Sequence, residues 1–187
     1  MMDPVMKSPD IERLSAFATI SRHERSIGID RGLLRTKCRE AAANARKREV
    51  LVLHRNGAEP LQRMLNALQP GSYIRPHRHG TPPKSETLVL LSGAAGFVVF
   101  EDDGAPDAAS SVLLHPARGA LAVDCRENVW HTFVALEPDT VLFESKAGPF
   151  DPGADREFAP WAPEEGSPEA PAYLQSLERE FRRASKL

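Results

Sequence analysis

Residues 71–93 read GSYIRPHRHGTPPKSETLVLLSG and place two histidines, His77 and His79, ahead of a carboxylate, Glu86. In an extended strand successive side chains point to opposite faces, so the two histidines share one side. The segment Gly-Thr-Pro-Pro at 80–83 predicts a bend that returns Glu86, at the head of the next strand, to that side. We interpret the stretch as three ligands of one metal ion. The alternative is a polar loop whose histidines make ordinary hydrogen bonds.

A third histidine lies further along the chain. Residues 127–133 read ENVWHTF and present His131 at the start of another strand, after Asn128, a residue that tolerates the left-handed conformation of a tight turn. The alternative is a capping or core histidine beside Trp130. Three imidazoles and one carboxylate suit zinc, manganese, iron or nickel, with no ranking among them. We therefore expect one divalent transition metal on the ligands His77, His79, Glu86 and His131.

Between residues 50 and 146 the chain consists of short apolar segments separated by Gly, Pro and Asp. Each segment has about the length of a strand, and no helix is expected between them. This order is typical of an antiparallel sandwich or a small barrel. The predicted strands are residues 50–54, 61–68, 86–93, 95–102, 111–115, 120–124, 131–136 and 140–146.

Helices are expected on both sides of this core. Apolar residues recur at helical spacing after Asp30, which is a plausible N-cap, and a short helix is expected over residues 10–20. After residue 147 the chain is rich in proline and should wrap the barrel before a final helix, YLQSLEREFRRASKL. The predicted division is an N-terminal arm at 1–28, a central domain at 29–165 and a C-terminal helix at 166–187.

These motifs resemble those of a known family, the cupins. Gly71, His77, His79, Glu86 and Gly93 follow the order of the first cupin motif, although six residues separate His79 from Glu86 where the motif has three or four. A closer similarity, over roughly residues 30–165, is to the WbuC-type cupin-fold metalloproteins. The resemblance implies an all-β core that forms a double-stranded β-helix, or jelly-roll barrel, with flanking N- and C-terminal helices. The matching residues are Gln62 to His79, Lys84, Glu86, Trp130, His131, Glu144, Lys146, Gly148, Pro149 and Trp161 to Pro163.

The resemblance also implies a function. It suggests a metal-binding protein that binds or acts on a sugar, a nucleotide-sugar or another small anionic metabolite, in bacterial surface-polysaccharide metabolism. An enzyme of this type would be a metal-dependent isomerase, epimerase or oxygenase, including a dioxygenase if the metal is iron. The alternative is a non-catalytic metal- and ligand-binding or regulatory module. The sequence contains no nucleophile paired with a base, phosphate loop or dinucleotide fingerprint, so no catalytic residue is assigned.

Four residues around the predicted metal are candidates for substrate binding: Lys84, Arg75, Arg78 and Asn66. Cations beside an open coordination position suit a carboxylate, sugar acid or phosphate, and Lys84 is the best single candidate. A solvated cationic rim, with Asn66 bonded to a neighbouring side chain, is the alternative. His54 is interpreted as a structural histidine.

The composition of the chain limits the classes of binding partner that are expected. Twenty-four Lys and Arg against 26 Asp and Glu give a formal charge of −2, which disfavours nucleic acid and anionic lipid as partners. No apolar run is long enough to span a membrane, and the first residues do not form a secretory signal, so a cytoplasmic protein is expected. Cys38 and Cys125 are interpreted as reduced thiols. A homodimer is expected because open sheet edges commonly pair.

Overall fold

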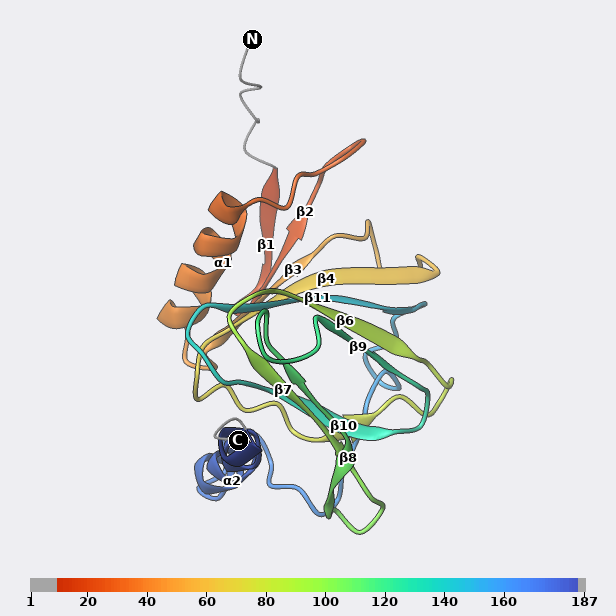
Figure 1. The fold of residues 1–187 in the computed structure, drawn as a ribbon. Coiled ribbons are helices and arrows are strands. Elements are labelled where there is room, and N and C mark those ends of the chain that lie inside the picture. Colours follow the sequence, from red (N-terminus) through yellow and green to blue (C-terminus); the bar gives the residue numbers. More distant parts are fainter. Residues whose placement is uncertain (1–9, 185–187) are drawn as a thin grey trace.

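The computed structural model describes residues 10–184, and their strands form two facing sheets (Figure 1). The first sheet contains, in order, β1 (Ile11–Ser15), β2 (Ala18–Ser21), β3 (Arg48–Val52), β4 (Leu61–Leu68), β11 (Thr140–Ala147), β6 (Glu86–Ser92) and β9 (Ala122–Cys125). The second contains β12 (Glu157–Phe158), β5 (His77–Arg78), β10 (Trp130–Ala135), β7 (Ala95–Phe100) and β8 (Pro106–Leu114). Neighbouring strands are antiparallel except β2 and β3, which are parallel.

The two sheets meet through apolar side chains that alternate along each strand. Leu88 and Leu142 from the first sheet pack against Phe97 and Phe133 from the second, and all four are almost completely buried. Because the side-chain period of a strand is two, every second residue of these strands faces the space between the sheets. The fold is therefore the predicted jelly-roll β core, and the polar residues that face the same space gather at one end of it.

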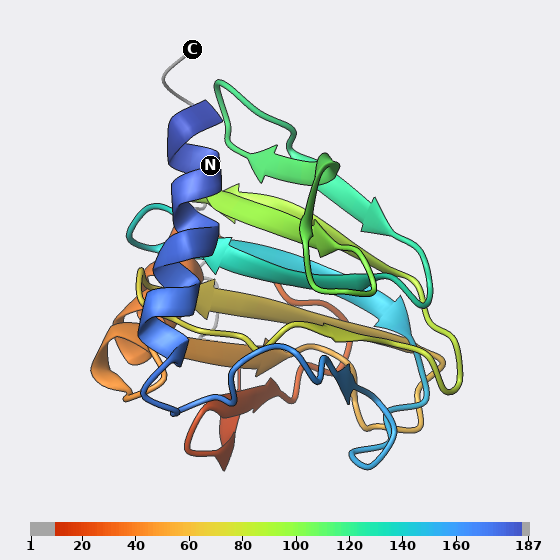
Figure 2. The ribbon, with the colours of Figure 1, turned by 90° about the horizontal axis from the view of Figure 1, so that it is seen from below.

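Each sheet carries one helix on its outer face (Figures 1 and 2). The first helix, α1 (Arg31–Ala43), packs on β3 and β4, and the Asp30 carboxylate accepts a hydrogen bond of 2.8 Å from the backbone N–H of Leu33. The predicted N-cap is thus confirmed. The C-terminal helix, α2 (Ala170–Ala184), crosses the second sheet, and a Cβ atom at Gly96 would lie 2.3 Å from the Phe181 ring. Only glycine permits this close packing of α2 on β7.

The predicted helix over residues 10–20 is wrong, because this segment forms β1 and β2. Ala18 to Ile20 pair with Val50 to Val52, which extends the first sheet by two strands. Pairing with β3 satisfies the backbone of a segment too short to form a stable helix by itself. Residues 1–9 of the predicted arm lie outside the described residues, and the proposed boundaries at 28 and 165 remain predictions.

The eight predicted strands are all present, with ends shifted by up to five residues, and β1, β2, β5 and β12 are added to them. The proline-rich segment after residue 147 runs along the barrel and contributes only β12, which pairs with β5. Cys38 and Cys125 are both buried free thiols. No helix between residues 10 and 184 has the length and apolar composition needed to cross a membrane.

Candidate metal centre

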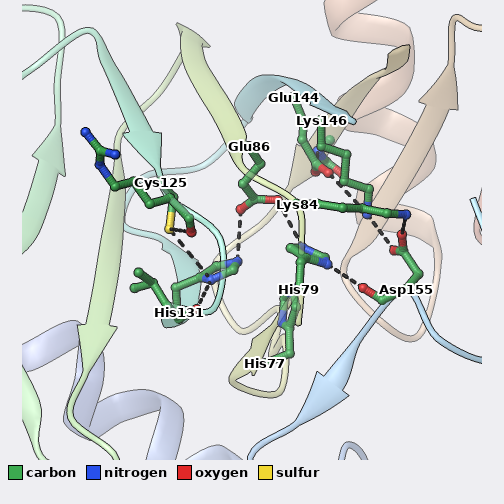
Figure 3. A network of polar contacts seen from close by, with 12 residues as sticks. His77, His79, Lys84, Glu86, Cys125, His131, Glu144, Lys146 and Asp155 are labelled. Atoms are coloured by element: carbon green, nitrogen blue, oxygen red, sulfur yellow. Dashed lines mark hydrogen bonds and ion pairs between the residues drawn. The ribbon is translucent and has the colours of Figure 1, made fainter. Parts of the chain in front are cut away.

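Three histidines meet at one end of the space between the sheets (Figure 3). His77 on β5 and His131 on β10 are direct cross-strand partners, and His79 follows two residues after His77. One ring nitrogen from each histidine lies within 4.8 Å of the other two, and the residues are only 1–2% exposed. Two nitrogens bound to one ion are at most about 4.2 Å apart, so binding would require only a small inward shift.

Hydrogen bonds to backbone carbonyls orient all three rings. The Nδ1 atom of His77 donates to Arg75 O at 3.0 Å, that of His131 donates to Val129 O at 2.9 Å, and that of His79 donates to Asp155 O. A carbonyl oxygen can only accept, so in each neutral ring the proton is on Nδ1 and the lone pair is on Nε2. Backbone carbonyls often orient metal-binding histidines in this way.

Glu86 adjoins two of the three histidines. Its Oε1 lies 2.9 Å from His131 Nε2 and its Oε2 lies 3.3 Å from His79 Nε2, and the carboxylate is buried. The turn at Gly80 and Pro83, which form an isolated β-bridge, returns the chain to β6 and brings Glu86 to this position. The predicted bend therefore places the carboxylate beside the imidazoles.

Three atoms of this cluster are buried without a hydrogen-bond partner: His79 Nε2, His131 Nε2 and Glu86 Oε1. Buried polar atoms are rarely left unsatisfied, because each costs about 1–3 kcal/mol of stability. The alternative, an ion pair between His131 and Glu86, accounts for the 2.9 Å contact. It leaves the lone pair of a neutral His79 Nε2 facing Glu86 Oε2 at 3.3 Å, with no donor between them. A cation between the four side chains would satisfy all three atoms at once, so the residues present fit a bound metal.

The charge states also suit a cation. Burial lowers the pKa of His77 well below its usual value, and the nearby Arg156 lowers it further. Burial raises the pKa of Glu86, but His131 and His79 together hold it well below the usual range. Burial lowers the pKa of His131, yet Glu86 and the neighbouring Cys125 together outweigh burial and raise it to about 10. Without metal, His131 and Glu86 therefore form an imidazolium–carboxylate pair, and a metal ion would replace the shared proton.

A second layer of buried charge surrounds the histidines (Figure 3). Asp155 binds Lys84 Nζ at 3.0 Å and Lys146 Nζ at 2.6 Å, while its backbone oxygen accepts the hydrogen bond from His79. Glu144 lies 3.9 Å from Lys146 and completes a set of two cations and two anions. Burial raises the pKa of Asp155, but Lys146, Lys84 and His79 together outweigh burial and lower it overall. Asp155 thus joins the histidine cluster to the buried lysines.

Sequence reasoning missed Asp155. It lies in the loop DPGADR, which has no periodicity and no motif that points inward. The only available signal was indirect, because two lysines near the predicted site, Lys84 just before β6 and Lys146 on β11, require a buried counter-ion.

The structure separates the four predicted substrate-binding residues. Lys84 is buried beside the metal cluster, and Asn66 Nδ2 donates to Glu144 Oε2 at 2.8 Å. Arg75 donates to Ala159 O, whereas Arg78 pairs with Glu157 and lies over the Trp130 ring at 4.3 Å. Strand alternation points Arg78 away from His77 and His79. Ligand binding by these residues remains a prediction.

His54 lies outside the histidine cluster. It is buried, and its Nδ1 is 3.1 Å from the backbone N–H of Arg63 on β4. This hydrogen bond gives His54 a structural role, which agrees with the interpretation made from the sequence.

A family model described as a domain of unknown function (DUF6016) matches residues 29–112, which is less than half of the chain. A comparison with curated proteins gives no match. The fold is similar to several solved structures of cupin-fold proteins. They include KdgF from Halomonas sp., with 19% identity, a TM-score of 0.42 and coverage of 56% of this chain and 81% of KdgF.

Two further solved structures have similar scores. The capsular polysaccharide assembling protein CapF from Staphylococcus aureus has 18% identity and a TM-score of 0.48, with coverage of 62% of this chain. Oxalate decarboxylase from Lactobacillus farciminis has 15% identity and a TM-score of 0.40, with coverage of 55% of this chain. The chain spans only 32% of CapF and 28% of oxalate decarboxylase. At these identities and scores, function must be argued from the site itself.

Proposed function

We propose that the protein binds one divalent transition-metal ion through His77, His79, His131 and Glu86, and uses it to bind or transform a small anionic metabolite. The observation that carries the proposal is the convergence of buried metal-binding atoms at one point. The Nδ1 protons of the three imidazole rings are already used in hydrogen bonds, so their Nε2 atoms can face one ion, and the Glu86 carboxylate adjoins two of them. Imidazole and carboxylate donors suit zinc, manganese, iron and nickel. The identity of the ion is part of what the experiment must measure.

A bound metal would act as a Lewis acid and hold an oxygen atom of the ligand. The chain contributes the surroundings of that oxygen. Backbone carbonyls keep the imidazole rings in place, and the buried sheet core excludes water. Lys84 and Lys146 supply positive charge nearby, although Asp155 and Glu144 balance it. A divalent ion held by three neutral imidazoles and one carboxylate would keep a net positive charge, which favours an anionic ligand over a neutral one.

The ligand class that we propose is a sugar, a nucleotide-sugar or another small anionic metabolite. The WbuC-type sequence resemblance supports this class and a setting in bacterial surface-polysaccharide metabolism. If the protein is an enzyme, the metal chemistry supports an isomerase, an epimerase or an oxygenase. A cytoplasmic homodimer without nucleic-acid or membrane partners completes the proposal, and light scattering at micromolar concentration would test the dimer.

One observation favours a second candidate, a non-catalytic metal-binding module. All four proposed ligands are at most 3% exposed, and four protein ligands are enough to close a tetrahedral zinc site. A closed site would stabilise the fold without binding a substrate. A catalytic site keeps at least one coordination position for water or ligand.

The test is elemental analysis of protein purified without chelator. We expect close to one metal per chain, and less than a tenth of that in the variant His77→Ala/His79→Ala. The isosteric variant Glu86→Gln should bind metal more weakly, because it removes an anionic donor while keeping the shape of the site. His54→Ala is the matched control, since it removes a buried histidine outside the cluster, and it should retain the metal.

Circular dichroism of each variant separates loss of the metal from loss of the fold. Full metal retention by the folded double variant would reject the site. Water-proton relaxation of the manganese-loaded protein then distinguishes the two candidates. An exchangeable bound water supports the ligand-binding proposal, and its absence supports the closed module.

A further inference from the structure

A cavity of about 720 Å³ lies beside the buried charges, between the inner face of β2, β3 and β4 and the segment that follows β11. This volume is typical of a small-molecule site. None of the four proposed metal ligands lines it, whereas Lys146 and Asp155 do. The cavity therefore adjoins the candidate metal centre through this lysine and this aspartate. Figure 3 shows the two residues in the same polar network as the histidines.

The walls of the cavity are apolar. Ile20, Val52 and Met64 line it from three adjacent strands, and Phe150 and Phe158 line it from the facing segment. The two phenylalanines are 46% and 48% exposed, which is unusual for large apolar side chains beside a cavity. An apolar ligand would cover this surface and gain about 25 cal/mol for each Å² removed from water.

The polar side chains of the cavity are mostly occupied already. Gln62 Nε2 donates to Glu59 O at 2.7 Å and to Gly57 O, and Asn66 Nδ2 donates to Glu144 at 2.8 Å. Apart from the arginine guanidinium groups of the lining, a polyhydroxylated ligand would therefore find few free donors to match its hydroxyl groups. Unmatched buried hydroxyls are costly, so the cavity disfavours a sugar.

The charge of the lining is strongly positive. The cavity is lined by one carboxylate, that of Asp155, and by four cationic side chains: Arg22, Arg55, Lys146 and Arg156. Arg22 is paired with a glutamate and Lys146 with Asp155. Within residues 10–184, the guanidinium groups of Arg55 and Arg156 form no hydrogen bond or ion pair. Two unpaired cations next to apolar walls are complementary to an anion attached to an apolar body.

We propose that this cavity binds a small amphipathic monoanion, a carboxylate with an aliphatic or aromatic body. Its apolar part packs against Ile20, Val52 and Met64 and under the two phenylalanines, and its carboxylate meets Arg55 or Arg156. The proposal does not depend on the metal, because no proposed metal ligand lines the cavity.

Calorimetry with octanoate tests the proposal. We expect one octanoate per chain, with octanol, acetate and glucuronate each bound at least about tenfold more weakly. Octanol lacks the charge, acetate lacks the apolar body, and glucuronate replaces that body with hydroxyl groups. Failure of octanoate to bind, or glucuronate binding as tightly as octanoate, would overturn the proposal.

Two variants locate the site. Arg55→Gln/Arg156→Gln should weaken octanoate binding at least about tenfold, while Arg179→Gln, an exposed arginine on α2, should leave it unchanged. Val52→Trp fills the cavity and should abolish binding, and Leu121→Trp, at a site 61% exposed, is its control. Unchanged affinity in the folded arginine double variant would refute the charge argument, and unchanged affinity in folded Val52→Trp would refute the location.

The variant His77→Ala/His79→Ala separates this proposal from the metal site. Octanoate binding by the folded, metal-free variant should equal that of the parent protein. Loss of octanoate binding in that variant would overturn the claim that the cavity is independent. If the parent protein failed to bind metal, the proposed function would be refuted, and octanoate binding would still decide the cavity proposal.

Discussion

Replacing Asp155 with asparagine should destabilise the protein severely. The carboxylate lies 3.0 Å from Lys84 Nζ and 2.6 Å from Lys146 Nζ, and the three side chains are at most 4% exposed. Asparagine keeps the size of the side chain and removes its charge. The carboxylate left to balance the two buried ammonium groups is then Glu144, 3.9 Å from Lys146, while Lys84 keeps its hydrogen bond to Pro149 O. Removing one partner of a buried ion pair costs about 3–5 kcal/mol.

Urea unfolding of the chelator-treated protein measures this cost. The matched control is Glu157→Gln, which breaks the Arg78–Glu157 pair at an exposed position and should cost less than about 1 kcal/mol. If Asp155→Asn lowered the free energy of unfolding by less than about 1 kcal/mol, the explanation given for the buried network would be refuted. Rescue by Asp155→Asn/Lys84→Met would support it, because that variant removes the charge that has lost its partner.

The pH dependence gives an independent check. The pKa of Asp155 is lowered in the folded protein, so its stabilising contribution is present above its unfolded pKa of about 3.9. That contribution is lost as pH falls through the folded pKa. The difference in unfolding free energy between the parent protein and Asp155→Asn should therefore be constant near neutral pH and shrink in acid. A difference that grows in acid would contradict the lowered pKa.

Further predictions concern the metal site and the helices. The pKa of His131 is raised to about 10 beside Glu86, so metal binding should release about one proton. The apparent association constant for the metal should therefore rise about tenfold for each pH unit between pH 6 and 8. An association constant that does not change with pH would contradict this. Gly96→Ala should cost about 1–3 kcal/mol in thermal or urea unfolding, because its Cβ would overlap the Phe181 ring, and the cost should shrink in a Phe181→Leu background. Asp30→Ala should cost about 1 kcal/mol through loss of the α1 cap, and no loss would show that the cap hydrogen bond is not needed.

Local sequence patterns predicted much of the core and the gathering of the histidines. Strand alternation placed His77 and His79 on one face, and the proline-containing bend returned Glu86 to them. The bounds of β4 were predicted without error, because residues 61–68 are apolar on one face and end at a proline-glycine turn. These features depend on neighbouring residues, and a single sequence contains that information.

The remaining features depend on long-range pairing. The segment of β1 and β2 is too short to show a clear period, and it is a pair of strands only because β3 is available beside it. Arg78 lies next to two histidines in sequence, yet Glu157 and Trp130 hold it on the other face. Asp155 enters the site from a loop 71 residues from Lys84 and 76 residues from His79 in the sequence. No local pattern encodes such contacts.

The most direct test of the metal centre is diffraction from crystals of the metal-loaded protein, measured on both sides of the absorption edge of the metal. The account predicts one anomalous peak per chain, with His77, His79 and His131 Nε2 about 2.0–2.1 Å from it and a Glu86 oxygen at a similar distance. An anomalous peak elsewhere, or no peak while His131 and Glu86 keep their direct contact in metal-soaked crystals, would contradict it.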